Sequence, residues 1–230
     1  MAKLLTLGCS LTYLKGWKEK LSELLNYENV NLSVVAGSNN LQINKFMEYI
    51  LDNDIHKDDI IVWQITYTTR NGLRLSSNSP LSEMAISIQN KTFAPLSSHY
   101  DINHNVFDKL PRYDLLCRSP ILNEKDIILE FDENDQLQKL LSVLILVRKW
   151  HDRLLVIFGS DKVIDDENKK IFTDYFTKHN VNYIDQSFTK WVFNARLNFL
   201  DMAHPDDEAG QEYAKRVLHK KLIELNWVAG

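Results

Sequence analysis

Two parts of the sequence, far apart along the chain, carry side chains that could together perform nucleophilic catalysis. Near the start, Ser10 lies in the segment 8–12, which reads GCSLT, and near the end Asp201 stands three residues before His204. An imidazole can take the proton of a serine hydroxyl, and a carboxylate can hold that imidazole in the required tautomer. The sequence therefore offers a nucleophile and its base, provided that the fold brings the two segments together.

The neighbours of these residues predict how they are positioned. Ser10 follows a short apolar run and precedes a segment with helical spacing, so its hydroxyl would project from the carboxyl edge of a sheet. Backbone amides of such a turn can donate to an oxyanion. Cys9 is expected in the core, because adjacent strand residues point to opposite faces. Pro205 restricts the backbone of His204, and the positive end of the following helix disfavours the imidazolium form.

Each segment also has a simpler interpretation. A Gly/Ser turn commonly follows a strand without any catalytic role. The acidic residues around His204 could cap the final helix or form an oxygen-rich metal site, and these residues are Asp201, Asp206 and Asp207. His99 and His104 have a spacing that could bind a metal, although no fourth clear ligand accompanies them. A metal site at His204 would leave the serine segment without a function.

The composition describes one slightly acidic globular domain. The chain has 230 residues, 44% of them hydrophobic, and its 27 Lys plus Arg against 31 Asp plus Glu give a net charge of -4. No basic run marks it as a nucleic-acid binder, and the longest apolar run, residues 140–147, is too short to span a membrane. Two distant cysteines, Cys9 and Cys117, cannot build a disulfide framework. The start of the chain does not have the pattern of a secretory signal, so a cytoplasmic protein is the default expectation, and a virion-borne or leaderless secreted protein would look the same.

Strand and helix patterns alternate along most of the chain. Short runs rich in Val, Ile and Leu predict buried strands at residues 3–7, 30–35, 60–65, 154–158 and 181–184. Apolar residues at helical spacing predict helices near residues 17–25, 41–51, 137–150 and 171–176, and a final helix over 207–225. This alternation indicates an α/β domain with a mostly parallel sheet, whose site lies beyond the carboxyl ends of the strands.

One stretch, residues 67–135, interrupts this alternation. It carries four of the five prolines and little clear periodicity, and it would leave from the carboxyl end of the third strand. An insertion of that length in a compact domain is usually functional or has structure that periodicity does not reveal. We therefore predict a single domain over residues 1–230, in which residues 67–135 form a lid or one wall of a pocket.

Three segments, in order, resemble the sequence blocks of the SGNH hydrolases, also called the GDSL esterase and lipase superfamily. Residues 8–12 (GCSLT) resemble the nucleophile block, residues 31–40 (NLSVVAGSNN) the glycine block, and residues 201–205 (DMAHP) the terminal Asp-x-x-His-Pro block. The resemblance covers the whole α/β frame except the insertion. It implies a flavodoxin-like, three-layer α/β/α sandwich with a mostly parallel five-stranded sheet.

The resemblance also implies roles for individual residues. Ser10 would be the nucleophile, His204 the general base and Asp201 the carboxylate that orients it. The backbone amides of Ser10 and Gly37 would stabilise the oxyanion. The family usually supplies a third donor from a Gly-x-Asn-Asp block after the third strand, whereas residues 63–70 read WQITYTTR here.

Nearby side chains could replace this donor or contact the substrate. Thr68 is the nearest substitute in the alignment, and Thr66 or Gln64 could reach instead. Arg70 could stabilise charge or bind an acidic group of the substrate, and Gln64 is a further candidate for substrate contact. The aromatic faces of two tyrosines beside the site segments could stack on a sugar ring, and these are Tyr13 and Tyr67.

The resemblance implies a serine esterase that hydrolyses a small acyl ester, such as an acetyl ester, on a carbohydrate or similar substrate. Such an enzyme needs no metal and no organic cofactor. Two alternatives stay open: an O-acyltransferase in which a sugar hydroxyl replaces water, and an inactive domain of the same fold that binds glycan or protein. Neither nucleic acid nor a membrane is an expected partner.

Overall fold

The computed structural model describes most of the predicted α/β frame and short parts of the insertion. The described residues are 1–13, 16–33, 39–66, 70–75, 99–103, 127–129, 133–161, 166–200 and 204–229. Only the backbone is described for Ser10, Tyr13 and residues 70–75, 99–103, 127–129 and 133–136.

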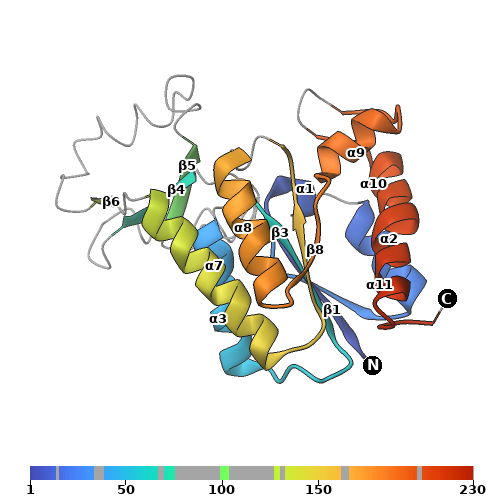
Figure 1. Ribbon diagram of the computed structural model, residues 1–230, viewed down its shortest axis with the longest axis horizontal. Coiled ribbons are helices and arrows are strands. Elements are labelled where there is room, and N and C mark those ends of the chain that lie inside the picture. Colours follow the sequence, from blue (N-terminus) through green and yellow to red (C-terminus); the bar gives the residue numbers. More distant parts are fainter. Residues whose placement is uncertain are drawn as a thin grey trace, which may run out of the picture.

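A five-stranded parallel sheet forms the centre of the domain (Figure 1). Its strands are β1 (Lys3–Leu7), β2 (Glu28–Asn31), β3 (Ile60–Ile65), β7 (Leu154–Phe158) and β8 (Asn182–Ile184), in the order β2-β1-β3-β7-β8. Every neighbouring pair is parallel. The strand order reverses between β1 and β3, and open α/β sheets bind ligands beyond the carboxyl ends of strands at such a point. The predicted five-stranded sheet is confirmed.

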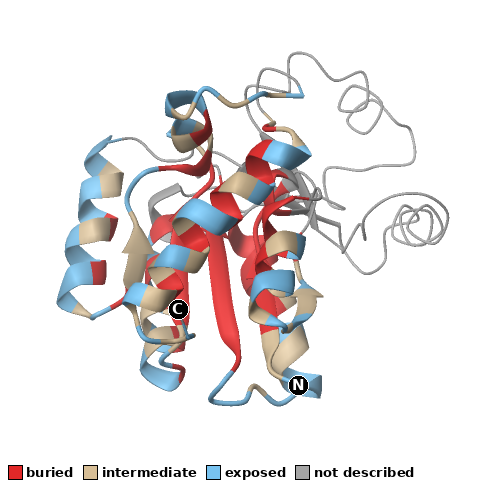
Figure 2. Cartoon of the chain, turned by 90° about the vertical axis from the view of Figure 1, so that its right-hand side faces the viewer, coloured by how far each residue is buried: buried red, intermediate tan, exposed pale blue. Residues whose placement is uncertain are grey.

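The central strands are buried on both faces. Leu5 and Trp63 belong to a cluster on one face, and Leu4 and Val62 belong to a cluster on the other. Figure 2 shows these strands as buried and the outward sides of the helices as exposed. Continuous apolar runs are typical of parallel strands with helices on both sides. For that reason the sequence predicts the observed bounds of β1, β3 and β7.

Helices cover the two faces of the sheet and complete the three-layer sandwich (Figure 1). One layer contains α3 (Asn39–Asp52), α7 (Glu133–Trp150) and α8 (Asp166–Lys178). The other contains α2 (Trp17–Leu25), α9 (Phe188–Asn194), α10 (Asp207–Tyr213), the π-helix η2 (Ala214–His219) and α11 (Lys220–Glu224). A short helix, α1 (Ser10–Tyr13), follows β1. None of the described helices is both long and apolar enough to cross a membrane.

Some elements differ from the sequence prediction. β2 lies at Glu28–Asn31 rather than at residues 30–35, because it pairs with β1 through polar positions that an apolar pattern does not mark. α9 was not expected, since this seven-residue helix buries only Phe188 and Val192 and so lacks a periodic stripe. The final helix covers the predicted range but contains the π-helical segment η2.

Within the insertion, the described backbone forms a second, smaller sheet. β4 (Arg70–Leu75) pairs antiparallel with β5 (His99–Asn103) and with β6 (Ile127–Leu129). β4 also contacts α3 of the main frame. Most of residues 67–135 lies outside the described residues, so their role as a lid or pocket wall stays a prediction.

Two glycines let α2 and α10 pack closely, and this contact joins the two ends of the chain. A Cβ atom added to Gly210 would lie 3.1 Å from the Cα atom of Gly16, and one added to Gly16 would lie 3.5 Å from the carbonyl oxygen of Asp207. Gly16 follows Ser10 by six residues, and Asp207 follows His204 by three. The contact therefore holds together two helix starts that each adjoin a predicted catalytic segment.

Replacing Gly210 with alanine tests this packing. Within a helix, Gly→Ala normally raises stability by about 1 kcal/mol. Here the added methyl group would lie 3.0 Å from the backbone nitrogen of Trp17, which cannot rotate away. We expect Gly210→Ala to lower the free energy of unfolding by about 1 to 3 kcal/mol in urea denaturation. The exposed control Gln211→Ala should change it by less than about 0.5 kcal/mol. Equal stability of Gly210→Ala and the unmodified protein would contradict the close contact.

Candidate active site

The predicted nucleophile begins a helix at the end of a central strand. Ser10 is the first residue of α1, and Gly8 and Cys9 connect it to β1. Figure 1 shows α1 at the same end of the sheet as the start of α10. The backbone of Ser10 therefore lies at the carboxyl edge, as predicted. Cys9 is 1% exposed and belongs to the hydrophobic core, which confirms the prediction for this thiol.

Hydrogen bonds to the end of β3 fix the turn that carries Ser10. The backbone N–H of Thr12 donates to the carbonyl oxygen of Cys9 at 2.9 Å, and Thr12 Oγ1 donates to Gln64 Oε1 at 2.9 Å. Gly8 makes this packing possible, because a Cβ atom there would lie 2.1 Å from Thr12 Oγ1. Any side chain at position 8 would thus displace the turn.

Gln64 supports the turn from inside the protein. Its side chain is fully buried. A Cβ atom at Gly159, just after β7, would lie 3.2 Å from the Cδ atom of Gln64. The Gln64 amide therefore fills the space between the residues that follow β1 and β7. The Nε2 atom of Gln64 has no hydrogen-bond partner among the described residues. This burial leaves Gln64 no open face toward a substrate, so its observed role is to position Thr12 rather than to contact the substrate as the sequence suggested.

A second link at the carboxyl edge joins the start of α3 to the end of β3. Asn39 Nδ2 donates to the carbonyl oxygen of Thr66, and the N–H of Thr66 donates to Asn39 Oδ1, both at 3.0 Å. Both residues are buried. The sequence analysis missed this link, because nothing in the pattern pairs residues 27 positions apart. Asn39, near the end of the glycine block, was the available signal.

A short backbone hairpin holds His204 next to α10. Phe199 and Pro205 form an antiparallel bridge, and the N–H of Leu200 donates to the carbonyl oxygen of His204 at 2.8 Å. The N–H of Asp206 donates to the carbonyl oxygen of Asn198 at 3.2 Å. The backbone of the predicted base is therefore tied to the segment that follows α9, and its side chain is half-buried.

Asp206 has the capping role that the sequence left open. Its Oδ1 atom accepts from the N–H of Ala209 at 2.8 Å, so it is the N-cap of α10. Among the residues that the structure describes, no group of three or more His, Cys, Asp or Glu is arranged to hold a metal ion. His104 and Asp201, which belong to the two metal alternatives, lie outside the described residues.

Other predicted site residues have only partial descriptions. Gly37, Tyr67, Thr68 and Asp201 lie outside the described residues. Arg70 and Tyr13 are placed by their backbones alone, Arg70 as the first residue of β4 and Tyr13 as the last residue of α1. Their roles in oxyanion stabilisation or substrate binding remain predictions.

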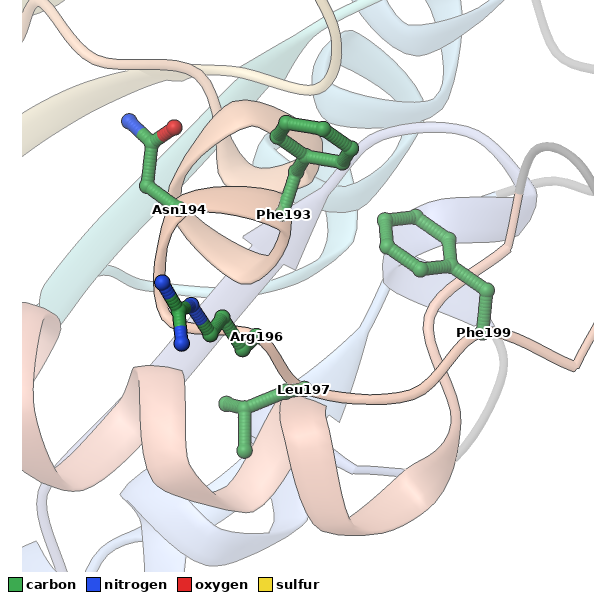
Figure 3. A pocket seen from close by; sticks show the side chains of 5 residues that line it. All are labelled: Phe193, Asn194, Arg196, Leu197 and Phe199. Atoms are coloured by element: carbon green, nitrogen blue, oxygen red, sulfur yellow. The ribbon is translucent and has the colours of Figure 1, made fainter.

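A pocket of about 480 Å³ adjoins the His204 hairpin, and no sequence pattern predicted it (Figure 3). It is lined by the end of α9 and the segment after it: Phe193, Asn194, Arg196, Leu197 and Phe199. Figure 3 shows the two phenyl rings on one side and the Arg196 guanidinium on the side of Asn194. The pocket thus combines aromatic faces with a positive charge.

The chain matches no protein-family model and no curated protein. It is similar in structure to a member of the lipolytic G-D-S-L family from Veillonella parvula, with a TM-score of 0.52, 14% identity and coverage of 98% of both chains. A protein from Slackia heliotrinireducens, described as an SGNH hydrolase, has a TM-score of 0.50 and 14% identity, with coverage of 96% of this chain and 98% of that one.

Similar solved structures also include an acetylxylan esterase from Geobacillus stearothermophilus. A catalytic mutant of it, with a serine replaced by alanine, has a TM-score of 0.52 and 13% identity and covers 100% of this chain and 97% of that chain. A second catalytic mutant of the same esterase replaces a histidine with alanine. These likenesses extend over essentially the whole chain. The chain has the SGNH hydrolase fold. The sandwich that the sequence resemblance implied is thereby confirmed.

Within this SGNH fold, Thr12 and Thr6 give a matched test of the serine turn. Both are fully buried, but Thr12 donates to Gln64 whereas Thr6 Oγ1 has no partner among the described residues. We expect Thr12→Val to lower the free energy of unfolding by about 1 to 3 kcal/mol, because it leaves the buried Gln64 Oε1 with only the weak Cys9 thiol donor at 3.7 Å. Thr6→Val should be neutral or stabilising, since it removes an unpaired buried hydroxyl. Chemical denaturation measures both, and equal losses would contradict the assigned hydrogen bond.

Proposed function

We propose that this protein is a serine esterase that removes a small acyl group, such as acetyl, from a carbohydrate. The observation that carries the proposal is the contact between α2 and α10, the helices that follow the segments bearing Ser10 and His204. The Geobacillus acetylxylan esterase of similar fold is represented by catalytic mutants at a serine and at a histidine. That pair of residue types supports the same two roles for Ser10 and His204 in this chain.

In the first half-reaction, the hydroxyl of Ser10 attacks the ester carbonyl while one ring nitrogen of His204 takes its proton. Asp201 accepts a hydrogen bond from the other ring nitrogen and so selects the tautomer. The backbone amides of Ser10 and Gly37 donate to the tetrahedral oxyanion. When this intermediate collapses, His204 returns the proton to the leaving alcohol, and the acyl group stays on Ser10.

In the second half-reaction, His204 takes a proton from water, which attacks the acyl carbonyl on Ser10. When this intermediate collapses, His204 returns the proton to the Ser10 oxygen and the free acid is released. Preorganised donors are effective because they need no reorganisation when the charge develops. The hydrogen bonds of Thr12 fix the backbone of the turn that contains Ser10, and so hold one proposed donor in place. Thr68 is the proposed third donor, and Arg70, Tyr13 and Tyr67 are proposed substrate contacts.

Hydrolysis of p-nitrophenyl acetate by Ser10→Ala tests the nucleophile. Loss of the hydroxyl should lower kcat by about 10³-fold or more, because no acyl-enzyme can form. His204→Ala should cause a loss of similar size. Cys9→Ala is the matched control at the adjacent position, since this buried thiol belongs to the core, and it should retain most of the activity.

Labelling by a fluorophosphonate separates an active esterase from an inactive binding domain. Intact-mass spectrometry should detect one adduct on the unmodified protein and on Cys9→Ala, and none on Ser10→Ala. Equal hydrolysis rates for the unmodified protein and Ser10→Ala, or an adduct that persists in Ser10→Ala, would remove this serine from the mechanism.

A further inference from the structure

Four described helices end in the same backbone arrangement, and one of them carries an unexpected residue. After α2, α8, α9 and α11, one residue has a φ of 55–56° and donates its N–H three residues back, while the next residue donates five residues back. This Schellman arrangement needs the left-handed conformation, which glycine adopts freely and asparagine tolerates. The residues at this position are Asn26, Asn180, Arg196 and Asn226.

Among the described non-glycine residues with positive φ, three are asparagines and Arg196 is the exception. A long side chain with a Cβ atom is strained in this conformation, whereas glycine or asparagine would end α9 at lower cost. The stability of the helix end thus does not explain an arginine here. A residue that is strained in the left-handed conformation, where glycine or asparagine would serve, is a common mark of a functional position.

The Arg196 side chain is exposed and makes no ion pair with the residues that the structure describes. Of the four arginines whose side chains the structure describes, Arg148, Arg153 and Arg216 each pair with a carboxylate, and Arg196 pairs with none of the described carboxylates. Arg196 is one of the residues that line the pocket at the end of α9, and Figure 3 shows its guanidinium on the side of Asn194, away from the two phenyl rings. An unpaired guanidinium can bind a carboxylate through two parallel hydrogen bonds. The pocket is thus suited to an anionic ligand.

The residues that line the pocket besides Arg196 indicate what kind of anion would fit it. Phe193 is 71% exposed, and together with Phe199 it presents apolar ring faces (Figure 3). Asn194 adds an amide that can both donate to and accept from hydroxyl groups. Flat apolar faces, an amide and a guanidinium match a sugar ring that has an apolar side, hydroxyls and a carboxylate. A small inorganic anion would use only the guanidinium.

The pocket shares one residue, Phe199, with the hairpin that carries His204. Phe199 forms the bridge with Pro205, and the N–H of the next residue, Leu200, bonds to the carbonyl oxygen of His204. One wall of the pocket and the proposed base therefore belong to the same hairpin. A ligand in the pocket would therefore contact the hairpin that carries the proposed base.

We propose that this pocket is a substrate subsite that binds a uronic acid unit next to the acylated sugar, with Arg196 on its carboxylate. The inference rests on the proposed function for the carbohydrate nature of the substrate. It narrows that substrate to an acidic saccharide. Arg196 then determines specificity, and its backbone strain is offset by the binding that its side chain provides.

Binding of unesterified disaccharides tests the subsite without any turnover. Isothermal titration should give about tenfold tighter binding for disaccharides containing glucuronic or galacturonic acid than for the matched neutral disaccharides. Arg196→Asn should abolish this preference and raise Tm by about 2 to 4 °C, because asparagine suits the left-handed position. Arg216→Gln loses the same charge elsewhere and should keep the preference.

The outcomes separate this inference from its alternatives. A lower Tm in Arg196→Asn would mean that the arginine is structural, and it would overturn the proposal. Equal binding of acidic and neutral disaccharides would do the same, as would inorganic phosphate competing as well as the free uronic acid. If the preference holds but Ser10→Ala hydrolyses esters normally, the esterase proposal fails and the subsite stands. If ester hydrolysis depends on Ser10 but acidic and neutral disaccharides bind equally well, the subsite proposal fails and the esterase proposal stands.

Discussion

The close approach of α2 and α10 at Gly16 and Gly210 is the constraint on which the candidate site depends. Ser10 and His204 lie 194 positions apart, and the two helices that adjoin them touch through backbone atoms. Around this contact, Tyr213 is fully buried against the rings of Phe188 at 4.6 Å and Trp191 at 5.4 Å between centroids. Burial raises the pKa of Tyr213 and keeps its hydroxyl neutral. The same packing that joins the chain ends therefore fixes α9.

The central strands of the sheet are apolar and form the core, whereas the polar side chains of the candidate site lie at their carboxyl ends, here called the rim. β3 is entirely buried, and its single polar side chain, Gln64, lies one residue before the carboxyl end. Beyond that end, Thr66 gives both backbone groups to Asn39. Thr12, Gln64, Asn39 and Thr66 are buried here with at least one hydrogen-bond partner each, which offsets part of the cost of removing polar groups from water. These hydrogen bonds lie where the strands end and the turns of the candidate site begin.

The sequence predicts the frame well and the rim only in outline. Apolar runs mark β1, β3 and β7 because these strands are covered on both faces, whereas the half-buried edge strand β2 gives a weak pattern. Motifs identify Ser10 and His204, and the structure describes their backbones at one edge of the sheet. The pairing of Asn39 with Thr66 and the strained position of Arg196 depend on three-dimensional contacts and dihedral angles. No local pattern encodes either of them.

The final helix contains one additional residue in its π-helical segment η2, compared with a regular α-helix that would keep the same side chains facing the sheet. Its buried side chains Tyr213, Leu218 and Leu222 follow at steps of five and four residues. In a regular α-helix, a five-residue step turns the side chain by about 140°. The wider turn of η2 absorbs the additional residue, so the buried stripe keeps facing the sheet. Loss of one residue within 214–219 would convert this turn to ordinary α-helix without rotating either flank. The chain can therefore change length by one residue here while the hairpin that bears the imidazole keeps its orientation.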